Sequence, residues 1–292
     1  MDNKSLTEKD YRERVNNVLV FINKNLGEKL DLNILASVSN FSPFHFHRIV
    51  RAFINEPLGT YIIRLRVEMA AGLIENTDLS ITDICFKVGY DSLSSFNKAF
   101  KKRFDISPSE YRENKNAKLN YMKENDMEAQ INLLNFKLKP KVKDYKNKKA
   151  VYIQSFGDYS GPATGESWNK IFEFVKKNRL FHWKTECFGI SLDNPDITET
   201  DKCRYMACVT VSKEVKPDGE VGVTNIEGGR FAVFRYRGPY SNLNLVYAAI
   251  IRRWLPQSGY DLREQPLMEK YLNNPAKTKP ERLLTEIYVP VQ

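Results

Sequence analysis

A pattern of apolar and small residues occurs twice between the start of the chain and Tyr111, and it constrains the fold more than any other feature. The residues Leu32, Leu35, Ala36, Phe46 and Tyr61 recur in the same order as Ile81, Ile84, Cys85, Phe96 and Tyr111. In each copy a short apolar run at helical spacing leads to a residue suited to a left-handed turn, Asn40 or Gly89, and then to a second helical run. The sequence therefore predicts two helix-turn-helix units in tandem, each with its own recognition helix.

The second copy shows how each unit is expected to form. Ser80 is placed to cap a short helix, with Asp83 as its capping-box partner. A second helix is expected to begin near Ser92, with Phe96 and Phe100 facing inward and small polar residues and lysines facing outward. An outward face of this kind suits a DNA groove, and the first copy has the same plan.

The second copy and its continuation resemble a known family signature. Gly89–Ser92, Phe96–Phe104 and Ser107–Arg112 resemble the signature of the AraC/XylS transcription regulators, and the resemblance covers roughly residues 8 to 113. In that family two recognition helices enter successive major-groove segments on one face of the duplex, and a linking helix, here at Leu58–Arg66, sets their separation. The resemblance implies an all-α, tandem helix-turn-helix domain that binds double-stranded promoter DNA.

The positions that match the family's DNA-facing residues carry side chains suited to bases and phosphates. Arg48 can donate two hydrogen bonds to guanine, whereas Lys98 can contact a guanine or a phosphate. Relatives often carry tryptophan where Phe44 stands and glutamine where His47 stands, so the operator cannot be inferred. The residues expected at the DNA are Phe44, His47, Arg48, Arg51, Leu93, Ser94, Ser95, Lys98, Lys101 and Lys102, with Arg51, Lys101 and Lys102 at phosphates.

The positive charge of the chain is concentrated outside this motif. Of a net charge of +9, residues 1 to 113 contribute +1, residues 114 to 150 contribute +6, and residues 151 to 292 contribute +2. The basic segment is rich in lysine: Lys137, Lys139, Lys141, Lys143, Lys146, Lys148 and Lys149. Two interpretations stay open. The segment either adds nonspecific, salt-sensitive affinity for DNA or only keeps a linker solvated.

Length and composition predict two domains. A chain of 292 residues with 42% hydrophobic residues can bury two cores, and we expect domains at 1–113 and 150–292 joined by a basic linker at 114–149. No run approaches the roughly 18 apolar residues of a membrane span, so a cytoplasmic protein without membrane contact is expected. The four cysteines form no CxxC pattern and His45 and His47 lack neighbouring ligands, so neither a metal nor a cofactor is expected.

The second domain is expected to be α+β and internally duplicated. Strand patterns alternate with two helices, one at residues 168–177 and one at residues 243–255. The second carries apolar residues at helical spacing: Leu245, Ala248, Ala249, Ile251 and Trp254. Gly157–Ser160 returns later in the chain as Gly238–Ser241, each between a strand and a helix. The sequence therefore predicts two strand-helix-strand-strand halves with a ligand cleft at their joint.

This region also resembles a known module. The motifs Gly228–Phe231, Tyr236–Tyr240, Trp254–Tyr260, Met268–Tyr271 and Glu286–Val291 are similar to those of the GyrI-like effector-binding domains, over about residues 140 to 292. An AraC-type domain followed by this module is the order found in Rob-like regulators. The resemblance implies a site for hydrophobic, often cationic small molecules, with Glu269 in the pocket.

Physical chemistry supports such a role for a carboxylate. A carboxylate in an aromatic cleft is costly to desolvate, and a lipophilic cation offsets that cost. Glu269 is the first candidate and Glu286 the second, with candidate pocket walls at Tyr152, Trp168, Tyr205, Tyr236 and Tyr288. The alternative is that Glu269 pairs with a nearby Lys or Arg, and the direction of Glu286 is left undetermined.

Together these features predict a ligand-responsive transcription regulator. It is expected to act as a monomer on promoter DNA, not as an enzyme, with RNA polymerase as a candidate further partner. Two alternatives stay open. The second domain could be a hydrolase with Glu269 as general base, although no Ser-His-Asp arrangement supports one, or the protein could sequester toxic ligands. Drug protection that survives loss of Arg48 and Lys98 would identify the sequestering protein.

Overall fold

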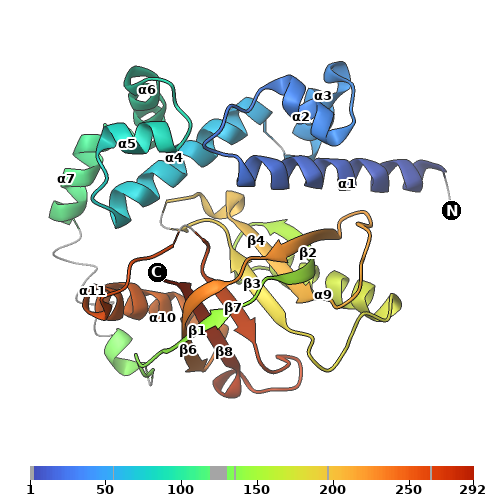
Figure 1. The fold of residues 1–292 in the computed structure, drawn as a ribbon, viewed down its shortest axis with the longest axis vertical. Coiled ribbons are helices and arrows are strands. Elements are labelled where there is room, and N and C mark those ends of the chain that lie inside the picture. The colour runs from blue at the N-terminus through green and yellow to red at the C-terminus, as the bar shows by residue number, and fades with distance from the viewer. Residues whose placement is uncertain (1–2, 55, 119–129, 135, 196, 264) are drawn as a thin grey trace. The chain divides into compact units, whose positions relative to one another are not determined.

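The computed structural model describes the chain except residues 1–2, 55, 119–129, 135, 196 and 264 (Figure 1). It forms two compact units, the first comprising Met1–Tyr121 with Asp218–Glu220 and the second comprising Met122–Pro217 with Val221–Gln292. No helix in the described part of the chain is long and apolar enough to cross a membrane.

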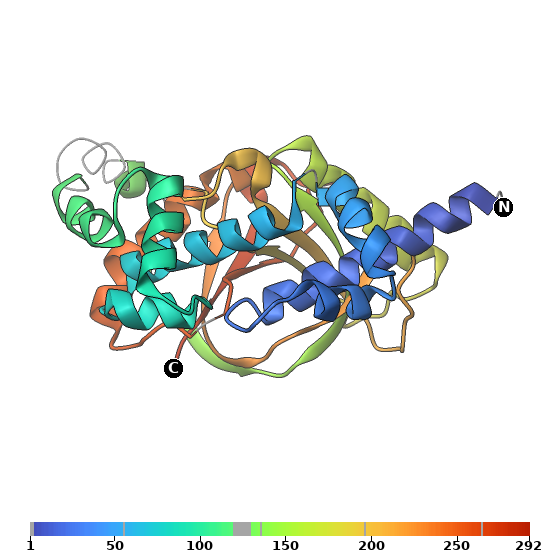
Figure 2. The same ribbon diagram turned by 90° about the horizontal axis from the view of Figure 1, so that it is seen from above.

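The first unit is entirely helical. Its helices are α1 (Asn3–Lys24), α2 (Leu32–Ser39), α3 (Pro43–Ile54), α4 (Leu58–Asn76), α5 (Ile81–Lys87), α6 (Leu93–Phe104) and α7 (Pro108–Lys118). The pairs α2–α3 and α5–α6 are the two helix-turn-helix units, and α4 runs between them, as Figure 2 shows. The predicted tandem arrangement is confirmed.

The turns form as the sequence predicts. The Ser80 side chain accepts a hydrogen bond from the backbone N–H of Asp83, and Ser92 caps α6 in the same way. Asn40 and Gly89 both adopt positive φ, at 54° and 86°. At Gly89 a side chain is excluded by space as well, because a Cβ would lie 2.7 Å from the Arg66 guanidinium of α4. The second turn therefore requires glycine.

An ion network inside the first unit fixes α6 against α4. Arg64 and Glu68 of α4 are both buried and lie 3.2 Å apart, and Arg64 also binds Glu56 at 2.7 Å. Arg103, in the last turn of α6, reaches Glu68 at 3.4 Å. Phe96 and Phe100 are fully buried beneath the same helix. The outer face of α6 is thus held at a defined orientation to α4.

The second unit is an eight-stranded antiparallel sheet with helices. The strands are β1 (Lys141–Tyr145), β2 (Lys148–Phe156), β3 (Cys187–Ser191), β4 (Arg204–Thr210), β5 (Gly222–Ile226), β6 (Gly229–Arg237), β7 (Met268–Tyr271) and β8 (Leu284–Pro290). Their order is β1-β6-β8-β7-β3-β4-β2-β5. Helix α9 (Pro162–Lys177) follows β2, and α10 (Leu243–Ala249) continues through a π-helical turn (Ile250–Trp254) into α11 (Leu255–Ser258).

The duplication is confirmed and proves larger than predicted. The elements β1, β2, α9, β3 and β4 return in the same order as β5, β6, α10, β7 and β8, and their starting residues are displaced by a nearly constant interval, as from Lys141 to Gly222. The two halves join where β3 pairs with β7. The first strand of each half is exchanged, because β1 pairs with β6 and β5 pairs with β2. Each half thus supplies the outer strand of the other.

The exchange corrects the expected linker. Strand β1 and the start of β2 lie inside the segment 114–149 that composition assigned to a linker. Strand β1 is an edge strand whose side chains are largely exposed, and it carries Lys141, Lys143 and Asp144, so its composition is that of a solvated linker. The second unit therefore begins well before residue 150.

Both long helices cover the same face of the sheet. Helix α9 packs on a core that includes Ala207 of β4, and α10 packs on a core that includes Ile287 of β8. The sheet register runs from Ala207 through Gly189 and Glu269 to Ile287, so all four lie on one face. Glu269 therefore stands at the seam between the two cores.

Candidate nucleic-acid interface and ligand site

The outward face of each recognition helix carries the predicted DNA-contacting residues. On α3, His47, Arg48 and Arg51 are exposed while Phe46 and Val50 are buried. Phe44 lies on the same helix, but its side chain is outside the described part of the structure. On α6 the predicted residues are all exposed: Leu93, Ser94, Ser95, Lys98, Lys101 and Lys102.

The basic residues of the first unit divide into two groups. Arg66 is committed internally, since it donates to the backbone carbonyls of Leu26 and Glu28 at 2.9 and 2.6 Å, and Arg64 and Arg103 bind carboxylates. By contrast, within the described residues no ion pair is formed by the outward set Arg48, Arg51, Lys98, Lys101 and Lys102. The outward set is therefore available to bind an anion such as a phosphate.

A chain of hydrogen bonds converges on Glu269 in the second unit. Tyr247 of α10 donates to Glu269 Oε1 at 2.8 Å, and Tyr271 of β7 donates to Oε2. The Tyr271 hydroxyl lies 3.0 Å from that of Tyr205, and Trp168 of α9 donates to Tyr205 at 3.1 Å. Because Tyr271 has one hydroxyl proton and directs it to Glu269, Tyr205 is the donor to Tyr271. The chain of donors therefore runs from α9 through both halves to one carboxylate.

Aromatic rings surround the same carboxylate. Tyr271 meets the ring of Tyr240 at 5.2 Å between centroids and that of Trp168 at 5.5 Å, and Tyr159 lies 6.0 Å from Tyr205. Opposite Glu269 in the register stands Gly189, where a Cβ would collide with the hydroxyls of Tyr205 and Tyr271. A glycine at 189 thus makes room for the two hydroxyls.

Burial dominates the electrostatics of this cluster. Glu269 is 7% exposed, and burial raises its pKa although the hydrogen bonds from Tyr271 and Tyr247 oppose the rise. Burial and then the charge of Glu269 raise the pKa of Tyr240 to about 12. No Lys or Arg of the described residues lies within ion-pair distance of Glu269. The ion pair that the sequence left open is not formed there.

One further polar group at the seam has no partner. Thr285 of β8 is fully buried and pairs in register with Tyr271. Its hydroxyl makes no hydrogen bond within the described part of the chain. A buried hydroxyl without a partner is costly, and here it lies beside the carboxylate cluster.

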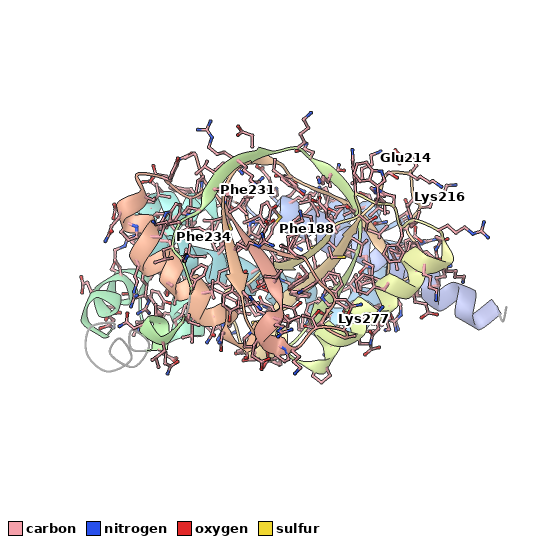
Figure 3. The ribbon with its side chains drawn as sticks, turned by 90° about the horizontal axis from the view of Figure 1, so that it is seen from below. Phe188, Glu214, Lys216, Phe231, Phe234 and Lys277 are labelled. Atoms are coloured by element: carbon pink, nitrogen blue, oxygen red, sulfur yellow. The ribbon has the colours of Figure 1, made fainter. Side chains whose placement is uncertain are left out.

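Four other predicted pocket residues are not in this cluster. Tyr152 alternates with Val151 and Ile153, which pack under α9, so its ring lies on the opposite face. Tyr288 is on that face too, with its ring centroid 5.8 Å from those of both Phe188 and Phe231, whereas Phe234 packs in the core under α10. Figure 3 labels these three phenylalanines. The structure therefore does not bring Tyr152 or Tyr288 together with Glu269.

Glu286 and Tyr236 are also placed elsewhere. Glu286 accepts a hydrogen bond from Tyr288 at 3.1 Å and lies 4.0 Å from Lys270, on the face opposite Glu269. Tyr236 packs in the core under α10, and its hydroxyl donates to the carbonyl of Pro239 at 3.4 Å. Of the predicted pocket residues, the structure therefore brings together Glu269, Trp168 and Tyr205.

Sequence reasoning missed two direct partners of Glu269. Tyr271 follows Glu269 by two positions in a strand, so the period of two could have placed it on the same face. Tyr247 was missed because the prediction assigned the wrong side of this helix to the core. The buried residues of this helix are Leu243, Val246, Ala249 and Ile250. Of the predicted set Leu245, Ala248, Ala249, Ile251 and Trp254, Ala249 is buried and Trp254 packs partly buried against the core. In the described residues, no group of three His, Cys, Asp or Glu could hold a metal.

Comparison with known proteins gives matches for both units. A model described as a GyrI-like small molecule binding domain matches residues 138–292, and a helix-turn-helix domain model matches residues 35–114. The probable transcriptional regulator YgiV of Escherichia coli K12 is 36% identical over 110 residues, covering 37% of this chain and 68% of YgiV.

Two further matches were found, one to a relative and one to a solved structure. The transcriptional activator AarP of Providencia stuartii is 40% identical over 98 residues, covering 34% of this chain and 73% of AarP. A cryo-EM structure of an EcmrR–DNA complex aligns with 89% of this chain and 98% of that chain, at 16% identity and a TM-score of 0.48.

Proposed function

The chain belongs to the family of GyrI-like small molecule binding domains, preceded by an AraC-type helix-turn-helix domain, and we propose that this DNA-binding transcription regulator senses a lipophilic cation through Glu269. The observation that carries the proposal is a buried carboxylate whose partners among the described residues are tyrosine hydroxyls and not cations. A carboxylate in such surroundings is poorly compensated when ionised.

A lipophilic cation fits these surroundings in two ways. Its charge would compensate the carboxylate that burial disfavours, and its apolar surface would contact the rings of Tyr240, Tyr271 and Trp168. The donor chain from Trp168 holds the tyrosines in place, so the carboxylate is oriented before a ligand arrives. Preorganisation of this kind lowers the entropic cost of binding.

The DNA-binding role is proposed for the outward residues of α3 and α6. Arg48 and Lys98 would read bases, whereas Arg51, Lys101 and Lys102 would neutralise phosphates. Because the two reading helices belong to one unit, a monomer would bind an asymmetric site, and RNA polymerase is its proposed partner at the promoter. We place the DNA-binding domain at residues 1–113.

Ligand recognition is tested by calorimetric titration with tetraphenylphosphonium. Glu269→Gln keeps the size of the side chain and removes its charge, and we expect affinity to fall by at least tenfold, about 1.4 kcal/mol. Glu286→Gln, on the opposite face of the sheet, is the matched control and should bind as the wild type does. Equal binding by wild type and Glu269→Gln would contradict the proposal.

DNA recognition is tested by selection from random duplexes at physiological salt. The wild type should enrich one asymmetric motif that spans two major-groove segments. The variant Arg48→Ala with Lys98→Ala should lose this enrichment, whereas Lys24→Ala with Lys29→Ala, two exposed lysines off the recognition helices, should keep it. An unchanged motif in the first variant would exclude Arg48 and Lys98 as the reading residues.

A further inference from the structure

The second unit carries four alternating lysines, two in the edge strand β1 and two in the residues just before it. Lys137, Lys139, Lys141 and Lys143, here called the lysine row, alternate with Leu138 and Val142. Leu138 packs on the core under α10, and Val142 pairs with Ala232 of the same core, so the lysines project from the other face. All four are exposed, and none forms an ion pair with another described residue.

Neighbouring strands extend this basic surface. Lys141 pairs in register with Val233 of β6, and Arg235 and Arg237 follow on the same face of that strand. Both arginines are exposed. The acidic residue nearest to them in register is Glu286, opposite Arg235, and it is engaged by Tyr288. The result is a surface of one sign of charge on two adjacent strands.

The duplication provides an internal comparison for the row. Lysines on an edge strand can serve only to prevent edge-to-edge aggregation. The equivalent edge strand β5 occupies the other end of the sheet, yet it carries no charged residue between Gly222 and Ile226. By the interval that relates β1 to β5, the counterparts of Lys137 and Lys139 are Asp218 and Glu220. Protection of a sheet edge in this fold therefore does not require a basic row.

We infer that the lysine row binds the phosphate backbone of the same duplex that the helix-turn-helix domain occupies. Alternate residues of a fully extended chain are about 6.6 Å apart, so the row spans at most about 20 Å, a length over which a duplex presents on the order of ten phosphates. The chain between Lys118 and Lys137 reaches at most about 65 Å. A bound duplex is thus held at high effective concentration near the row. This inference rests on the DNA-binding function and is independent of Glu269.

The test is the salt dependence of DNA binding by the full chain. Lys137, Lys139, Lys141 and Lys143 are changed together to Gln, and the matched control changes four exposed lysines of the same unit, Lys176, Lys177, Lys277 and Lys279. Binding is measured from low to physiological salt on the selected site with long flanks, on the site without flanks, and on a long random-sequence duplex. Circular dichroism and thermal unfolding verify that both variants fold.

Each phosphate contact contributes about 0.9 to the slope of log K against log salt. We expect the row variant to lose about 2 to 3 from this slope on the long duplexes, while the control keeps the wild-type slope. The Lys-to-Arg version of the row should restore it, because charge alone is required. The selected motif should not change, since phosphate contacts carry no sequence information.

The outcomes separate the inference from the proposed function. Equal slopes for wild type and row variant on both long duplexes would overturn the inference and leave the regulator intact. Equal loss in the control would also overturn it, because net charge would then explain the effect. A wild type that enriches no motif would contradict specific DNA reading, yet the random duplex would still decide whether the row binds phosphates.

Discussion

Glu269 is buried and Glu186 is half-buried, and these two carboxylates of the second unit have different hydrogen-bond partners. Glu186 accepts from Lys270 at 2.6 Å, from Tyr145 at 2.5 Å and from Lys148. Glu269 accepts from two tyrosines and has no cation among the described residues. Burial is the largest influence on the pKa of both and raises it, but the hydrogen bonds of Glu186 outweigh burial and lower its pKa, whereas those of Glu269 do not.

The difference teaches what kind of role each carboxylate can have. A carboxylate that already has two ammonium partners contributes to stability and has little to gain from a further cation. A buried carboxylate whose hydrogen bonds do not offset the cost of its desolvation contributes little to stability, and it gains the most free energy when a cationic ligand binds. Lys270 is adjacent to Glu269 in β7, but alternation in a strand sends it to the other face, toward Glu186.

The largest expected effect separates the two carboxylates by stability. Glu186→Gln removes the counter-ion of Lys148 and Lys270, and we expect a loss of about 2 kcal/mol in the free energy of unfolding, less than for a fully buried pair because both lysines are partly exposed. Glu269→Gln should change stability by less than about 1 kcal/mol. Denaturant unfolding measures both, with Glu281→Gln on the surface as control. A larger loss from Glu269→Gln would invert the comparison.

Next in size is the pH dependence of cation binding. Only ionised Glu269 attracts the cation, so affinity should rise with pH by up to about tenfold per unit until pH passes its raised pKa, and then level off. Glu269→Gln should bind weakly and without this dependence. Titration with tetraphenylphosphonium from pH 4.5 upward measures both. An affinity independent of pH in the wild type would show that Glu269 is ionised throughout that range.

The raised pKa of Glu269 and the lowered pKa of Glu186 make stability depend on pH in opposite directions. The folded state holds a proton on Glu269 more tightly than the unfolded state does, so this group's contribution to stability is lost as pH rises from about 4.5 through the raised pKa. Glu186 has a lowered pKa, so its contribution is present above about 4.5 and is lost as pH falls through the folded value. For each Gln variant, its free energy of unfolding is subtracted from that of the wild type at each pH. This difference should change above pH 4.5 for Glu269 and below pH 4.5 for Glu186.

Structural features that depend on neighbouring residues could be predicted from the sequence, whereas the pairing of distant segments could be predicted only in part. Caps and left-handed turns depend on neighbours, so Ser80, Asn40 and Gly89 could be assigned from the chain alone. The duplicated halves could be assigned because the repeat is local as well. The exchange of β1 and β5 could not, since strand pairing between distant segments leaves no local pattern.

The candidate ligand site shows the same division. Trp168 and Tyr205 were predicted with Glu269 and lie near it. Tyr152 and Tyr288 are aromatic strand residues that looked equally suitable in the sequence, but the alternation of side chains along a strand places them on the other face. Tyr247 was missed because α10 buries Leu243 and Val246, rather than Leu245 and Ala248, toward the core. Tertiary packing, not helical spacing read from one apolar set, decided the phase.

A smaller effect would come from filling the space beside Glu269. Gly189→Ala places a methyl group against the hydroxyls of Tyr205 and Tyr271, and we expect cation affinity to fall by about tenfold and stability by about 1 to 2 kcal/mol as the hydroxyls shift. Gly165→Ala in α9 meets no atom within 4 Å and should stabilise by about 0.5 to 1 kcal/mol. Calorimetric titration and thermal unfolding measure the pair. Unchanged affinity in Gly189→Ala would mean that the two hydroxyls do not position Glu269 for the ligand.

The smallest expected effect tests the far end of the donor chain. Trp168→Phe keeps the aromatic contact with Tyr271 and removes the hydrogen bond to Tyr205, so Tyr205 loses a donor that is two hydroxyls away from Glu269. We expect a loss of about 0.5 to 1 kcal/mol in cation binding, a two- to fivefold change in affinity. Trp183→Phe, at a side chain that is 88% exposed, is the control and should have no effect. If both variants bind alike, the orientation of Glu269 depends on Tyr247 and Tyr271 alone, and the part of the chain contributed by α9 supports the fold and not the ligand.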